Sequence, residues 1–216
     1  MDETKAANLE PYYFADRSDI LAFVPDGVNR VLDIGCAGGR FGSEVKSRGA
    51  QVWGIEMVPE AAYEAATRLD RVLQGTFRDV EDQLQGELFD LITFTDVLEH
   101  MTDCEEVLRD VRKYLAPGGR VLASLPNIRH WPELLTIFWR GDFPYQDSGI
   151  FDRTHVKFFT QKSMLRMFDQ CGYNVETCEG INGFVGGKLP LANFLTRGRF
   201  KDCAFLQFAI LARPRS

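Results

Sequence analysis

The 216-residue sequence contains no apolar run that approaches the roughly 18–20 residues of a membrane-spanning helix. It also lacks an excess of basic residues: 25 Lys and Arg stand against 31 Asp and Glu, for a formal net charge of −6. A protein that neutralises nucleic-acid phosphates needs a basic face, so this balance argues against a nucleic-acid partner. The N-terminus shows no basic region followed by an apolar run. We therefore expect a cytoplasmic protein without membrane contact.

Cysteines are few, odd in number and without C-x-x-C spacing, which argues against both a disulfide framework and a zinc site. We expect reduced, mostly buried thiols and no metal. The five are Cys36, Cys104, Cys171, Cys178 and Cys203. The chain has no internal repeat, and its length and 45% apolar content fit a single domain over residues 1–216.

A glycine-rich stretch at residues 31–42 predicts a strand, a tight loop and a helix over 40–48. Glycine accepts positive φ and lets backbone amides approach a ligand closely. Because the loop opens a helix, free N–H groups and the helix dipole favour an electron-rich or anionic ligand group there. The stretch therefore predicts a ligand cradle.

The residues around this loop argue against a dinucleotide. A G-x-G-x-x-G fingerprint that starts at Gly35 fails at Ala37 and Arg40. Asp33, two residues before Gly35, would repel a pyrophosphate but can hold an ammonium group, directly or through water. The strand predicted over 51–56 ends in a second acid, Glu56, which can accept hydrogen bonds from both hydroxyls of a ribose. The alternative for Glu56 is an ordinary exposed glutamate at a strand end.

Further strands are predicted over 71–74, 88–94, 120–125, 173–178 and 204–212, with helices over 59–69, 103–114 and 162–170. With Asp33, Gly35 and Gly39 in the loop and a D-V-L-E-H run at 96–100, the chain resembles the class I S-adenosylmethionine-dependent methyltransferases. Ala37 stands where that family usually has its middle glycine, and it should be tolerated if its φ is negative. The resemblance implies an α/β fold, a doubly wound seven-stranded mixed sheet with an antiparallel last strand, and S-adenosylmethionine as cofactor.

The resemblance also implies a set of cofactor contacts. The acids Asp33 and Glu56 would bind the methionine and ribose parts, and Met57 would lie against the adenine. An N-terminal aromatic segment with a following arginine would lie over the cofactor, or it would be an aromatic strap packed on the core. The full set is Tyr13, Arg17, Asp33, Gly35, Cys36, Ala37, Gly39, Glu56, Met57, Thr76, Phe77, Thr95 and Asp96.

Residues 126–160 interrupt the alternation of strands and helices after the fifth strand and are rich in aromatic residues. They predict an inserted cap over a small-molecule acceptor, with a helix over 132–140. The alternative is extra core or a homodimer contact. A D-x-T-H-x-K-F-F-T run at 152–160 resembles a bacterial subgroup found among polysaccharide and secondary-metabolite genes.

His155 in that run is the first candidate for a general base, with His130 and His100 behind it, because a neutral imidazole can take a proton near pH 7. The alternative for His155 is a structural role, with hydrogen bonds to Asp152 or to the backbone. The expected reaction is methyl transfer to an O or N nucleophile of a small molecule, with S-adenosylhomocysteine as product. The subgroup resemblance favours a sugar or glycosylated metabolite. A non-catalytic cofactor-binding or partner subunit and a nicotinamide-dependent oxidoreductase are the alternatives.

Overall fold

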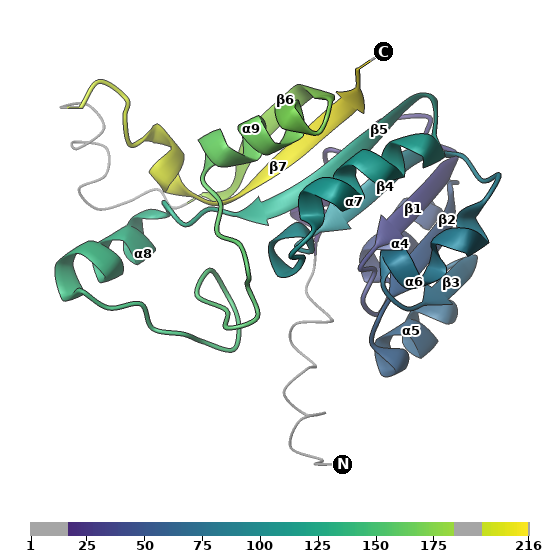
Figure 1. Ribbon diagram of the computed structural model, residues 1–216, viewed down its shortest axis with the longest axis horizontal. Coiled ribbons are helices and arrows are strands. Elements are labelled where there is room, and N and C mark those ends of the chain that lie inside the picture. Colours follow the sequence, from purple (N-terminus) through teal and green to yellow (C-terminus); the bar gives the residue numbers. More distant parts are fainter. Residues whose placement is uncertain (1–16, 184–195, 216) are drawn as a thin grey trace. The chain divides into compact units, whose positions relative to one another are not determined.

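The computed structural model describes residues 17–183 and 196–215 (Figure 1). They form two compact units: residues 17–95 with Asp110–Leu122, and Asp96–Arg109 with 123–183 and 196–215. Seven strands are hydrogen-bonded in the order β3-β2-β1-β4-β5-β7-β6, and β5 (Leu115–Pro126) contributes residues to both units. This order confirms the predicted seven-stranded mixed sheet. The single-domain organisation stays a prediction.

The first unit is built on four parallel strands. They are β1 (Arg30–Ile34), β2 (Gln51–Glu56), β3 (Arg71–Gln74) and β4 (Phe89–Thr95). Their aliphatic side chains are buried, as expected for strands covered on both faces. Strand β1 lies between β2 and β4, and Asp33 is in register with Gly54 on one side and with Thr93 on the other. The carboxyl end of β1 is therefore at a topological switch point, where such sheets bind ligands.

The helices of this unit begin at recognisable signals. Gly39, with φ of 76°, precedes α4; Pro59 begins α5. Thr76 and Asp79 form a capping box at α6. The helices here are α3 (Ser18–Leu21), α4 (Arg40–Ser47), α5 (Pro59–Ala66), α6 (Phe77–Val80), η1 (Glu81–Leu84) and η3 (Val111–Tyr114).

The second unit contains β6 (Tyr173–Gly183) and β7 (Phe205–Pro214), which pair antiparallel, as predicted for the last strand. Helix α9 (Gln161–Gln170) begins at a capping box of Thr160 and Ser163, and its buried face carries Met164, Met167 and Phe168. The remaining helices are η2 (Leu98–His100), α7 (Cys104–Asp110, whose last residue belongs to the first unit), α8 (Trp131–Leu135), η4 (Thr136–Arg140) and η5 (Lys201–Ala204).

Several predicted boundaries were wrong. The sixth strand continues past Cys178 to Gly183 because β7 goes on pairing with it, a contact far apart in the sequence. The fifth strand begins at Leu115 instead of Arg120. The predicted helix over 132–140 begins at Trp131 and changes to a π-helix at Thr136, and neither part has a buried residue to hold one regular geometry.

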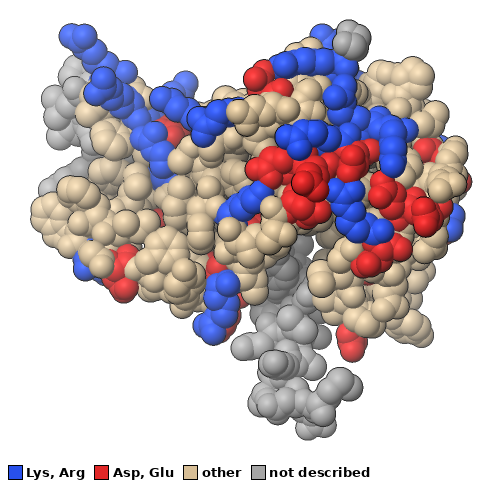
Figure 2. Space-filling model, viewed as in Figure 1, with Lys and Arg blue, Asp and Glu red and all other residues tan. Residues whose placement is uncertain are grey.

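The aromatic residues of 126–160 divide into a packed cluster and an exposed group. Phe143 has ring contacts with Tyr145, Phe151 and Phe158 at centroid distances of 5.2, 4.7 and 5.3 Å. Phe138 and Trp139 are 83% and 81% exposed. The surface around α8 carries few charged side chains in the view of Figure 2. A role of this segment as a substrate cap or dimer contact stays a prediction.

Two expectations from composition have a structural counterpart. All five cysteines are free, and four of them are buried, which confirms the expected thiols. Among the described residues, no helix has both the length and the apolar character needed to cross a membrane.

Candidate active site

The glycine loop after β1 has three residues in the left-handed region: Gly35 (φ 74°), Ala37 (φ 47°) and Gly39 (φ 76°). A negative φ, the condition under which alanine was expected to be tolerated at position 37, is therefore not met. An L-residue in this region costs about 1–2 kcal/mol, so other contacts must hold the conformation. Gly39 N donates to Cys36 O at 2.8 Å, and a Cβ on Gly39 would lie 3.0 Å from Cα of Ala65 in α5. Close packing of loop on helix therefore requires glycine at position 39.

Glu56 holds the loop in this shape. Its side-chain oxygens accept hydrogen bonds from the backbone N–H groups of Ala37 at 2.9 Å and Val58 at 2.8 Å. The residue is only 5% exposed. The alternative of an exposed glutamate at a strand end was therefore wrong. Each carboxylate oxygen retains a second lone pair, so Glu56 can still accept from ribose hydroxyls.

Asp33 is fully buried at the end of β1. Its Oδ1 accepts a 2.7 Å hydrogen bond from the Thr93 hydroxyl, while Oδ2 is buried without a partner among the described residues. Burial raises the pKa of Asp33 to about 6; the Thr93 hydrogen bond and the Arg17 charge oppose the rise, and the Glu56 charge adds to it. A cationic donor at Oδ2 would stabilise the ionised form.

Three other predicted contacts from this unit have side chains that are already used in packing or capping. The Cys36 thiol packs on Gly54, where an added Cβ would lie 2.5 Å from Sγ. Thr76 caps α6. Phe77 is 1% exposed and its ring contacts Tyr114 edge to face, so any cofactor contact here would come from the backbone. Met57, by contrast, is 65% exposed and available to a ligand.

The N-terminal contacts are only partly described. Tyr13 lies outside the described residues. Arg17 is half-buried, forms an ion pair with Asp19 at 3.7 Å, and its charge acts on Asp33.

Strand β4 ends at the half-buried Thr95, and the next residue, Asp96, belongs to the second unit. Asp96 has φ of 56°, a left-handed conformation that favours glycine. Its backbone N–H donates to the Ser124 hydroxyl at 3.0 Å, and its carboxylate accepts from the same hydroxyl at 2.7 Å and from Gln207 Nε2 at 3.0 Å. These two partners hold the carboxylate in place, and neither was predicted from the sequence.

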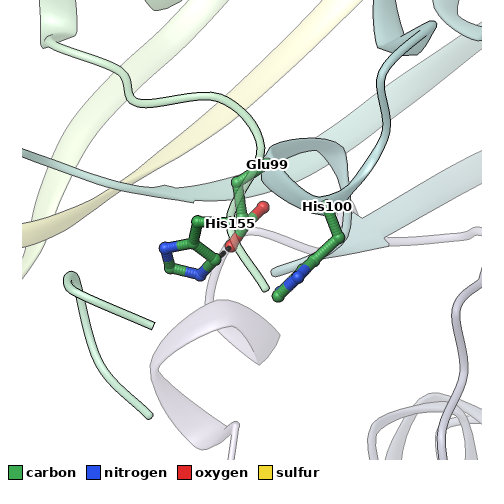
Figure 3. Close-up of side chains that lie close together, drawn as sticks. All are labelled: Glu99, His100 and His155. Carbon is green, nitrogen blue, oxygen red and sulfur yellow. Dashed lines mark ion pairs between the residues drawn. The ribbon is translucent and has the colours of Figure 1, made fainter. Parts of the chain in front are cut away.

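Two of the three histidines lie together in the second unit, beside Glu99 (Figure 3). The His100 and His155 rings are 4.7 Å apart, edge to face, and His155 Nε2 lies 4.0 Å from Glu99 Oε1. Glu99 is 1% exposed, and it was missed as a site residue although it precedes His100 directly. Burial, and then the neighbouring His155, lower the pKa of His100, which favours its neutral form.

The loop at 150–157 is fixed to η2 by backbone bonds. The N–H groups of Val156 and Lys157 donate to the Glu99 carbonyl at 3.0 and 3.1 Å. His155 Nδ1 lies 3.1 Å from the Ile150 carbonyl oxygen, so it contacts the backbone as the structural alternative expected. This contact leaves Nε2 on the side of Glu99, so the two roles are compatible.

His130 lies apart from this cluster, just before α8. Its Nδ1 pairs with Glu133 at 2.6 Å, and its Nε2 is buried without a partner among the described residues. A role in catalysis stays a prediction.

The residues around β1 fit S-adenosylmethionine. The unpartnered Oδ2 of Asp33 suits its ammonium group, and Glu56 suits its ribose diol. None of these features suits a pyrophosphate.

Comparisons with known proteins agree with this fit. A family model described as "Methyltransferase domain" matches residues 6–177. The ubiquinone biosynthesis O-methyltransferase of Aeromonas salmonicida is 29% identical over 184 residues, which cover 82% of this chain and 74% of that protein. The enzyme of the same name from Idiomarina loihiensis is 32% identical over 204 residues, with coverage of 87% and 76%.

The fold is shared as well. A crystal structure of a SAM-dependent methyltransferase from Archaeoglobus fulgidus superposes with a TM-score of 0.71 at 16% identity, over 94% of this chain and 97% of that one. The alternative of a nicotinamide-dependent oxidoreductase has no support in these findings. The chain belongs to the methyltransferase domain family and is an S-adenosylmethionine-dependent methyltransferase.

Proposed function

We propose that this enzyme methylates a hydroxyl oxygen of a small molecule. The observation that carries the proposal is the group formed by the buried Glu99 with the half-buried His100 and His155, which offers a hydroxyl acceptor a means of losing its proton. An amine nucleophile needs no such group. The names of the relatives, which describe O-methyl transfer in ubiquinone biosynthesis, support oxygen as the acceptor atom.

The cofactor supplies an electrophilic methyl group on a sulfonium, and the chain's own residues bind and orient it. Asp33 would receive the ammonium group on Oδ2, and Glu56 would accept the ribose hydroxyls while holding Ala37 in place. Gly35, Gly39 and Met57 would complete the cradle, together with Thr95 at the end of β4. Asp96, the next residue, stays a predicted contact. The acceptor's proton would leave through the Glu99, His100 and His155 group, a step worth roughly 10²–10⁴ in rate for a base.

Two acceptor classes follow from different observations. The names of the relatives favour a phenolic ring hydroxyl. The D-x-T-H run at 152–160, with its aromatic neighbours, favours a sugar or glycosylated metabolite, because aromatic faces stack on sugar rings.

The test is formation of S-adenosylhomocysteine from purified protein and S-adenosylmethionine with a panel of catechols, phenols, sugar nucleotides and alkyl amines. We expect turnover with a hydroxyl class and its loss by at least roughly 10²-fold in His155→Ala. Arg153→Ala is the matched control, since this exposed neighbour on the same loop pairs only with surface groups. Turnover confined to amines would overturn oxygen transfer, and cofactor binding with no turnover on any class would favour the non-catalytic alternative.

A further inference from the structure

We propose that Glu99, His100 and His155 form a binding site for one divalent transition-metal ion. The three residues each present a ligand atom, and these atoms all lie within 4.8 Å of one another. All three belong to the second unit, where η2 and the 150–157 loop bring them together (Figure 3). Two imidazoles and one carboxylate are a common donor set for zinc and for iron(II).

The tautomers of both histidines suit a metal. A carbonyl oxygen only accepts, so Nδ1 of His155 must donate its proton to Ile150 O, and the lone pair is on Nε2. Nδ1 of His100 lies 3.3 Å from Thr154 O and 3.1 Å from Thr154 Oγ1. Metal-bound histidines almost always donate their other ring N–H to a carbonyl or carboxylate in this way.

The Thr154 hydroxyl belongs to the same supporting layer. It donates to Asp152 Oδ1 at 2.6 Å, so its own proton is used and its oxygen accepts from His100. Asp152 is 4% exposed and also accepts from the Thr154 backbone N–H at 2.7 Å. A chain from Asp152 through Thr154 to His100 therefore orients the ring.

The distances require only a small closure. His155 Nε2 and Glu99 Oε1 are 4.0 Å apart. Two ligand atoms about 2.0–2.1 Å from a tetrahedral zinc ion lie roughly 3.4 Å apart. This pair must close by about half an ångström, and no pair must close by more than about 1.4 Å, because the three ligand atoms lie within 4.8 Å of one another. The 1% exposure of Glu99 limits competition from water.

The role of the ion rests on the proposed function. Imidazole donors select zinc, copper, iron or nickel over magnesium, calcium and manganese. Glu99, His100 and His155 would hold the ion, and an ion held there would lower the pKa of a hydroxyl bound to it. With the ion bound, His155 would act as a ligand. The role of base proposed above then belongs to the metal-free chain.

The test uses the full chain, freed of metal with a chelator, and titrates it with Zn²⁺ in a calorimeter and with Co²⁺ in the visible spectrum. We expect one equivalent of each ion to bind, with affinity at least about tenfold weaker in His155→Ala and in Glu99→Gln. Thr154→Val, which leaves all three ligands in place, should weaken binding by roughly tenfold. His130→Ala is the matched control, because it removes the third of the chain's three histidines and should leave metal binding unchanged.

Each variant is first checked by circular dichroism, and Glu99→Gln keeps the test open if His155→Ala does not fold. No binding of either ion by the folded wild-type chain overturns the proposal, as does binding that is lost only in His130→Ala. Titration of the same metal-free samples with S-adenosylhomocysteine shows whether the cofactor site is intact when the metal is absent. A failure of metal binding can then be told apart from a failure of the proposed function. Full methyl transfer without metal overturns the role of the ion in the reaction, whereas a metal-loaded chain that methylates only amines overturns oxygen transfer.

Discussion

The Thr93 hydroxyl donates a 2.7 Å hydrogen bond to Oδ1 of Asp33, and Oδ2 of the same carboxylate is buried without a partner among the described residues. The two residues face each other from neighbouring parallel strands. A buried, half-satisfied carboxylate is costly in the free protein and favourable once a cation reaches it. Burial makes the charged form of Asp33 costly, and its pKa is therefore raised to about 6.

The first prediction concerns stability of the free protein. Because the folded pKa of Asp33 lies near 6 and its ordinary value is 3.8, the native state binds more protons between these values. Stabilisation by the protonated group is complete below about pH 4 and is lost as pH rises through 6, by roughly 3 kcal/mol. Asp33→Asn should remove this part of the pH dependence in urea unfolding between pH 4 and 7, while Asp26→Asn, at an exposed site, should not. Parallel pH profiles for wild type and Asp33→Asn would contradict it.

Cofactor affinity should rise with pH, whereas the stability of the free protein should fall. The ionised form of Asp33 binds an ammonium group, and at pH 5 only about one tenth of a carboxyl with pKa near 6 is ionised. Calorimetry should therefore show S-adenosylhomocysteine binding roughly tenfold more tightly at pH 7 than at pH 5. In Asp33→Asn the affinity should be low at both values. A wild-type affinity independent of pH would show that the Asp33 carboxylate does not bind the ligand's ammonium group.

Glu56 should matter for stability and binding together. Glu56→Ala removes two hydrogen bonds to a carboxylate, and we expect a loss of about 2–4 kcal/mol in the free energy of unfolding. S-adenosylhomocysteine affinity should fall by at least roughly tenfold, since the loop around Ala37 loses its anchor and the ribose its acceptor. Glu60→Ala, an exposed acid in the first turn of α5, is the control for charge. Unchanged binding in a folded Glu56→Ala protein would exclude the ribose contact.

Ala37→Gly should relieve backbone strain. The left-handed φ of 47° costs alanine about 1–2 kcal/mol, and glycine adds about 0.5–1 kcal/mol of unfolded-state entropy, so the variant should gain up to about 1 kcal/mol in thermal or urea unfolding. The same change at Ala61, inside α5, should instead lower stability by about 1 kcal/mol. Equal losses at both positions would show that Ala37 carries no strain.

Local patterns in the sequence determined the order of strands and helices and the places of the two acids. Aliphatic runs that end in Asp33 and Glu56 are readable without any neighbour, because strand formation and strand ends depend on nearby residues. The antiparallel last strand and the buried thiols also followed from sequence and resemblance. All the predicted cofactor contacts and the catalytic roles of His155, His130 and His100 remain predictions.

Only the tertiary structure decided what these residues do for one another. Thr93 meets Asp33 across 60 positions of sequence, Glu56 reaches back to Ala37, and His155 joins Glu99 from a separate loop. No local sequence pattern predicts such pairings, because they arise from strand register and loop packing. The positive φ at Ala37 has the same origin. The preference of an L-residue for negative φ is about 1–2 kcal/mol, and the anchoring hydrogen bonds and close packing of the loop outweigh it.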